Sequence, residues 1–149
     1  SHFDVVIANM MLYHVPDLNK GLLEVKRVLK PNGVFYAATF GENGLSEYLN
    51  KALFELDMVN DKKIEYIFTL QKGTSILSSF FDAVECYQYI DRLEISNVSD
   101  LIEYIKTMGI LGGITNLDEN KLRRYFESKR NENGILVIPK QYGTFIMKK

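Results

Sequence analysis

The sequence predicts an α/β fold, in which a mostly parallel sheet is flanked by helices. Phe3 to Ala8 is a short, continuously apolar run rich in β-branched side chains, which is typical of a strand buried on both faces. Val34 to Phe40 is a second such run, and a helical pattern lies between the two. The three segments span about 40 residues, the size of a right-handed parallel crossover unit. We therefore expect the first run to be a central strand.

The helix between these strands has its own start and stop signals. Its apolar residues recur at spacings of 4, 3 and 4, at Leu18, Leu22, Val25 and Leu29. Asp17 stands before them as an expected N-cap, and Pro31 to Gly33 follows as a stop. The pattern predicts an amphipathic helix within residues 16–30.

The rest of the chain predicts further helices and strands without a repeat or a linker. The predicted helices run from Leu45 to about Val59, started by Ser46, from Ser75 to Phe81, and from Val98 to Gly109, with a further helix around Leu122 that Asp118 caps. The predicted strands are Ala83 to Ile95, as one long strand or two collinear ones, then Ile135 to Ile138, and Tyr142 to Met147. Ile64 to Leu70 fits a strand or a helix equally well. We expect residues 1–149 to form a single unit.

Composition excludes several classes of protein. The chain is 46% hydrophobic and 25% charged, as in ordinary globular domains, and its net charge of −1 gives no reason to expect nucleic acid as a partner. No apolar run approaches the roughly 20 residues that span a bilayer, so no membrane association is expected. Two histidines and one cysteine predict no metal site, and Cys86 is expected to be a buried, inert thiol in mid-strand. We expect a reducing, cytoplasmic location.

Two segments stand where open parallel sheets bind ligands, at the carboxyl ends of strands. Ala8 to Pro16 places a polar Asn9 at the end of a buried strand and a Tyr13-His14 pair shortly after it. Phe40 to Ser46 follows the second strand. The alternative interpretation is that Asn9 is a turn residue and His14 a packed one, because ordered loops need such side chains for their own hydrogen bonds.

Three stretches resemble the class I S-adenosylmethionine-dependent methyltransferases: Phe3 to Asn9, Leu12 to Asp17, and Leu22 to Gly33. The resemblance covers the fourth strand, the next helix and the fifth strand of that family's seven-stranded sheet. It implies a final antiparallel strand beside the fifth, which Tyr142 to Met147 fits. It also implies that the N-terminal half of the fold, with the glycine-rich cofactor turn and the acidic ribose-binding residue, has no counterpart in these 149 residues.

The same resemblance implies site residues and a cofactor. The residues expected to contact S-adenosylmethionine are Ala8, Asn9 and Met10, with His14 on the wall of that pocket. The residues expected to contact the substrate are Tyr13, Phe40 and Gly41. No residue is assigned as catalytic. We expect methyl transfer to a small molecule in an intact protein, and weak or no cofactor binding by this chain alone. The main alternative is a non-catalytic fragment or interaction module; a nicotinamide-dependent dehydrogenase shares the fold class but fits less well.

Removal of neighbouring strands would leave the run Phe3 to Ala8 with an unpaired, apolar edge. Such edges recruit partners. We therefore expect a homodimer joined through this edge, and Val6→Lys to shift it toward monomer or unfolding.

Overall fold

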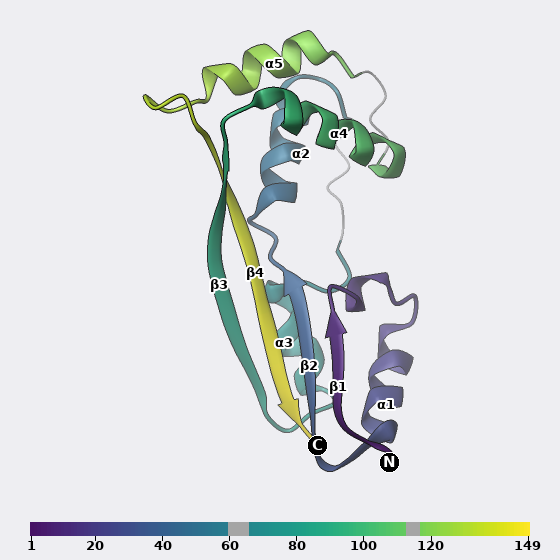
Figure 1. Cartoon of the computed structure of the whole chain (residues 1–149). Helices are drawn as coiled ribbons and strands as arrows, with labels where there is room; N and C mark the ends of the chain where they lie inside the picture. The colour runs from purple at the N-terminus through teal and green to yellow at the C-terminus, as the bar shows by residue number, and fades with distance from the viewer. Residues whose placement is uncertain (60–65, 113–116) are drawn as a thin grey trace. The chain divides into compact units, whose positions relative to one another are not determined.

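A computed structural model describes residues 1–59, 66–112 and 117–149 of the chain (Figure 1). Contacts divide the described chain into two compact units. The first contains residues 1–42, 66–90 and 141–149, and the second contains residues 43–59, 91–112 and 117–140. That residues 1–149 form a single methyltransferase-domain unit stays a prediction.

The described residues build one four-stranded mixed sheet. Its strands are β1 (Phe3–Asn9), β2 (Leu29–Phe40), β3 (Val84–Ile95) and β4 (Leu136–Lys148), in the order β1-β2-β4-β3. β1 and β2 run parallel and pair Val6 with Phe35, whereas β2 and β4 run antiparallel and pair Ala37 with Phe145. The predicted crossover and the predicted final antiparallel strand beside β2 are both confirmed.

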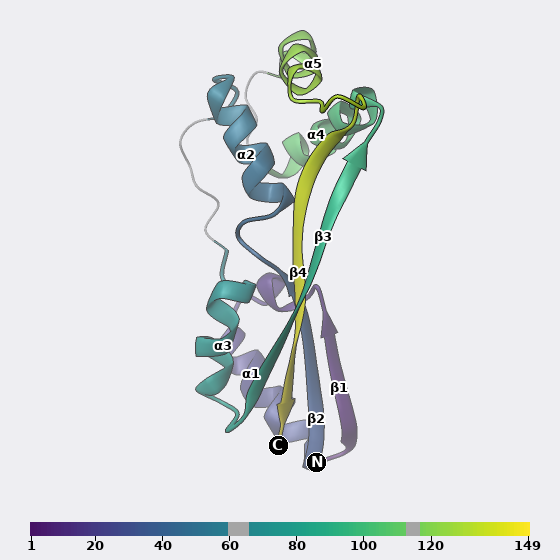
Figure 2. The same cartoon turned by 90° about the vertical axis from the view of Figure 1, so that its left-hand side faces the viewer.

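Helices cover one face of the sheet in the first unit. α1 (Leu18–Val28) and α3 (Leu70–Ser78) lie on the same side, as Figure 2 shows. Their inner side chains and those of β2 and β4 form one core, with Leu22, Phe35, Leu77 and Phe145 fully buried. Asp17 caps α1 as predicted, because its side chain accepts a hydrogen bond from the Lys20 amide at 2.9 Å.

β1 lies at the edge of this sheet, so the expectation of a central, doubly buried strand is wrong for this structure. It has a strand neighbour on one side only, and Phe3, Val5 and Ile7 are 53%, 48% and 62% exposed. Val6 and Ala8 face the helices and are half-buried. The apolar run therefore marks the strand correctly, but one of its faces has no cover in the described chain.

The second unit is mostly helical. α2 (Leu45–Glu55), α4 (Val98–Gly112) and α5 (Glu119–Ser128) enclose a separate core that includes Leu53, Ile102, Leu122 and Phe126. Asp118 caps α5 as predicted and accepts hydrogen bonds from the amides of Asn120 and Lys121.

Several predicted boundaries need correction. α2 begins at Leu45 after Gly44 and ends at Glu55, so Ser46 does not cap it. α3 begins at Leu70, five residues earlier than expected, because Thr69 caps it. β4 is one continuous strand that includes Pro139, but its buried positions shift from even to odd numbers along it, from Leu136 and Ile138 to Gly143, Phe145 and Met147. The first part of the ambiguous segment Ile64 to Leu70 lies outside the described residues.

Cys86 is exposed, which overturns the expectation of a buried thiol. β3 is the other edge strand of the sheet, and its neighbouring side chains Tyr87 and Tyr89 are also more than half exposed. Alternating apolar residues indicated the strand but could not show that it lies at an edge. Partial desolvation raises the pKa of the Cys86 thiol, which disfavours the reactive thiolate.

Candidate functional site

The carboxyl ends of β1 and β2 lie side by side in the first unit (Figure 1). Parallel pairing places Asn9 opposite Ala38, and the Met10 amide donates a hydrogen bond to the Ala38 carbonyl at 3.0 Å. The two segments singled out from the sequence, after Ala8 and after Phe40, therefore meet at one edge. This is the edge at which open α/β sheets bind ligands.

Met10 turns the chain sharply after β1. Its φ of 50° lies in the left-handed region, which is uncommon for a residue with a side chain. The turn leads directly into a short 3₁₀ helix, η1 (Leu12–His14), in which the His14 amide donates to the Met11 carbonyl at 2.9 Å. Backbone in such a conformation is found disproportionately at binding sites.

Asn9 is exposed, and its side-chain amide makes no hydrogen bond with the described residues. The turn interpretation required that amide to bond the loop that follows. The amide is instead available at the mouth of the sheet edge. Its predicted contact with a cofactor, like those of Ala8, Met10 and His14, stays a prediction.

Aromatic rings gather beside this turn. The ring of Phe40 lies 4.8 Å from that of Tyr13 and 4.8 Å from that of Tyr66, in both cases edge to face, and the Tyr13 ring lies 4.4 Å from the His14 ring. We call these four residues the aromatic cluster. Burial and, to a smaller extent, the neighbouring Tyr142 raise the pKa of Tyr13, so its hydroxyl stays protonated at neutral pH.

A hydrogen-bond network fixes the loop after β2. The Gly41 amide donates to the Gln141 carbonyl at 2.8 Å, and a Cβ on Gly41 would overlap the Gln141 side chain. The Glu42 amide donates to Gln71 at 2.9 Å, and the Glu42 carboxylate accepts a hydrogen bond from the Thr69 hydroxyl at 2.8 Å. The loop is therefore tied to the start of α3 and to β4.

The structure brings the predicted residues Asn9, Met10, Tyr13, Phe40 and Gly41 to one edge, and it adds residues that the sequence did not indicate. These are Tyr66, Thr69, Gln71 and Gln141. Their sequence separations from Phe40 are long, and no short motif contains them. The register of β2 against β4, which pairs Phe40 with Tyr142, brings Gln141 to the loop after β2. The packing of α3 brings Tyr66, Thr69 and Gln71 there.

The described residues contain neither a cluster of metal ligands nor a membrane-spanning helix. In residues 1–59, 66–112 and 117–149, no group of three or more His, Cys, Asp or Glu side chains is placed to hold a metal ion. Over the same ranges, no helix is both long and apolar enough to cross a membrane.

Sequence comparison matches residues 1–37 to the family model described as methyltransferase domain. The chain is also 50% identical over 44 residues to the mitochondrial arginine-hydroxylase NDUFAF5 of Dictyostelium discoideum, and 42% identical over 45 residues to that of Homo sapiens. These matches cover 30% of this chain but only 10% and 13% of the relatives.

Solved structures extend the likeness over the fold. The chain superposes on the YcgJ protein of Bacillus subtilis with a TM-score of 0.52 at 18% identity, and on a candidate methyltransferase of Bacillus halodurans C-125 with a TM-score of 0.53 at 15% identity. In both cases 99% of this chain is covered and 64% of the other chain.

Together these findings confirm the resemblance to the class I S-adenosylmethionine-dependent methyltransferases. It rests on sequence over residues 1–37 and on the fold over the described chain. The chain is an α/β protein with the Rossmann-like sheet of that class, and it spans about two thirds of the structures that it matches.

Proposed function

We propose that the protein is an S-adenosylmethionine-dependent methyltransferase that acts on a small molecule. The observation that carries the proposal is the match of residues 1–37 to the methyltransferase domain, because this segment contains β1 and the turn at its carboxyl end. Asn9, whose side-chain amide makes no hydrogen bond with the described residues, and Met10, whose backbone is in the left-handed region, lie at that turn, where open α/β sheets bind ligands.

The residues at this turn fit the cofactor. Asn9 offers an amide with two donors and one acceptor oxygen for the polar groups of a nucleoside or an amino acid. Ala8 is small and leaves room for a flat ring, while Met10 and His14 would flank it. S-adenosylmethionine supplies a methyl group already activated on a sulfonium. These residues therefore need to bind and orient it and to exclude water.

The acceptor would lie against Tyr13, Phe40 and Gly41. Tyr13 and Phe40 contact each other in the aromatic cluster and offer an apolar wall that excludes water. With its raised pKa, Tyr13 serves as a hydrogen-bond donor and not as a base. Gly41 lets the Gln141 side chain pack against the loop that would face the acceptor.

The curated relatives raise a second candidate activity. They are named arginine hydroxylases, and 30% of this chain matches them. They are also named mitochondrial, whereas the cytoplasmic location expected for this chain stays a prediction. The third candidate, a non-catalytic interaction module, would keep the sheet without binding the cofactor.

Cofactor binding separates these candidates. We expect calorimetric titration of the 149-residue chain to show weak binding of S-adenosylmethionine or none, with any Kd well above the micromolar range. In a longer natural protein that contains this chain, Asn9→Leu should weaken binding about threefold to tenfold, the effect of one lost hydrogen bond. Asn19→Leu, an equally exposed change on α1, is the matched control.

Three outcomes would count against the proposal. Micromolar binding by the chain alone would place the cofactor away from an incomplete site. Equal binding by wild type and Asn9→Leu would return Asn9 to the turn interpretation. No binding by the longer protein would favour the non-catalytic module, and turnover of arginine without methyl transfer would favour the hydroxylase.

A further inference from the structure

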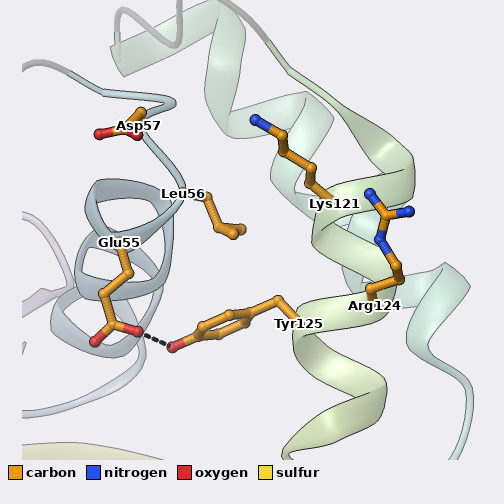
Figure 3. Close-up of a pocket in the computed structure, with 6 residues that line it drawn as sticks. All are labelled: Glu55, Leu56, Asp57, Lys121, Arg124 and Tyr125. Atoms are coloured by element: carbon orange, nitrogen blue, oxygen red, sulfur yellow. Dashed lines mark hydrogen bonds between the residues drawn. The ribbon is translucent and has the colours of Figure 1, made fainter.

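A pocket of about 430 Å³ opens in the second unit, between the C-terminal end of α2 and one face of α5 (Figure 3). Six residues line it: Glu55, Leu56, Asp57, Lys121, Arg124 and Tyr125. None of them belongs to the site at the ends of β1 and β2.

Opposite charges stand on opposite walls of this pocket. Figure 3 shows the carboxylates of Glu55 and Asp57 on the α2 side and the basic side chains of Lys121 and Arg124 on the α5 side. Lys121 and Arg124 are three residues apart, so they share one face of the helix. Within the described part of the chain, no ion pair joins the two walls, and neither cation is paired with a carboxylate.

The middle of the pocket is less polar. Leu56 lies between the charged walls, and the ring of Tyr125 forms part of the lining (Figure 3). The Tyr125 hydroxyl donates a hydrogen bond to Glu55 Oε2 at 2.8 Å, which fixes this carboxylate on the α2 side. Glu55 Oε1 accepts no hydrogen bond from the described residues and stays available to a ligand.

We propose that this pocket binds a zwitterionic small molecule whose acidic and ammonium ends are separated by a short apolar chain. Lys121 and Arg124 would hold the acidic end, the free Glu55 oxygen would hold the ammonium end, and Leu56 with Tyr125 would contact the chain between them. A simple anion would meet the two carboxylates, and a simple cation would meet the two basic side chains. Only a ligand with both charges matches both walls.

The inference does not depend on methyl transfer, since it uses only residues of the second unit. The probe is 6-aminohexanoate, titrated into the 149-residue chain and followed by NMR chemical shifts. We expect saturable binding in the millimolar range, because exposed ion pairs contribute little each. Hexanoate and hexylamine, which keep one charge each, should bind at least about threefold more weakly.

Single substitutions locate the site. Lys121→Gln and Glu55→Gln should each weaken binding about threefold to fivefold, because each removes one ion pair with the probe. Lys148→Gln, which removes an exposed cation in the first unit, should leave binding unchanged. An unchanged amide spectrum away from the substitution would verify that each variant is folded.

The proposal would be overturned by no saturation up to about 50 mM probe, by equal binding of hexanoate or hexylamine, or by equal affinity of Lys121→Gln and Lys148→Gln. Loss of 6-aminohexanoate binding would leave the cofactor titration unaffected, so failure here and failure of the methyltransferase proposal are distinguishable.

Discussion

Gly73 of α3 lies directly against the ring of Phe145 in β4. A Cβ on Gly73 would come within 2.3 Å of the Phe145 Cζ and 2.5 Å of its Cε2. Phe145 is fully buried and packs edge to face on Phe68, with 5.7 Å between ring centroids, so it has no space into which to move. The absent side chain therefore sets how closely the helix approaches the sheet.

Gly73→Ala should destabilise the chain although alanine favours helices. Overpacking a tight core costs about 1–3 kcal/mol, whereas the gain in helix propensity is about 1 kcal/mol. We expect the free energy of unfolding, measured with urea, to fall by up to about 2 kcal/mol. Thr74→Ala, at the exposed neighbouring position, should leave it unchanged or raise it slightly. A Gly73→Ala chain as stable as wild type would show that the helix can move away from the ring.

The fully buried Thr69 connects the start of α3 to the loop after β2. Its hydroxyl oxygen accepts a hydrogen bond from the Lys72 amide at 3.2 Å and donates one to Glu42. Thr69→Val keeps the shape but loses both bonds, so the free energy of unfolding should fall by about 1–2 kcal/mol. Thr69→Ser keeps the hydroxyl and should retain most of the stability. Equal losses in the two variants would assign the effect to packing and not to the cap.

Local patterns predicted the strands and helices because each pattern has a local cause. The apolar run at Phe3 to Ala8 gives β1, and the carboxylates of Asp17 and Asp118 start α1 and α5. The errors concern what lies next to an element. Exposure of Ile7 and of Cys86 depends on which strands are at the edges of the sheet and which of its faces other elements cover, and a strand's own residues do not encode this.

The candidate site was predictable only where it follows a strand end. Asn9 directly follows one apolar run, Tyr13 lies in the loop after it, and Phe40 ends the second run, and strand ends of a parallel sheet meet at one edge. Tyr66 and Gln141 are far from Phe40 and Gly41 in the sequence, and only the tertiary structure brings them into contact with these two residues. The charged pocket of the second unit likewise depends on packing between α2 and α5, which sequence spacing cannot supply.

Tyr125 gives the chain a pH dependence at high pH. Burial, followed by its hydrogen bond to Glu55, raises the pKa of Tyr125 to about 12. A raised pKa favours the protonated phenol in the folded state, so its stabilising contribution is complete below the ordinary pKa of 10 and is lost as pH rises toward 12. The free energy of unfolding of wild type should exceed that of Tyr125→Phe near pH 8, and the difference should shrink above pH 10. Tyr104→Phe, at an exposed position on α4, is the control variant. A constant difference at all pH values would contradict this assignment.

The exposed edge of β1 favours pairing with a second copy. We propose an antiparallel pair centred on Val6, in which Val5 lies opposite Ile7 of the other copy and Asp4 opposite Ala8. This register places no like charges opposite each other, whereas a pair centred on Asp4 would oppose two carboxylates. On the uncovered face, Ile7 pairs with Tyr36 and Tyr36 with Ile146, so the apolar surface extends beyond the strand itself.

Val6 is the wrong position for testing this dimer, because its side chain packs against the helix-covered core. Ile7→Lys is the better change, since Ile7 is 62% exposed on the open face and a lysine there can stay solvated in a monomer. We expect wild type to sediment as a dimer at micromolar to millimolar concentration, and Ile7→Lys to sediment as a folded monomer. Leu23→Lys, at a site 58% exposed on α1, should remain dimeric. A wild-type chain that stays monomeric over this range, or a dimer that Ile7→Lys leaves intact, would show that β1 does not join two copies.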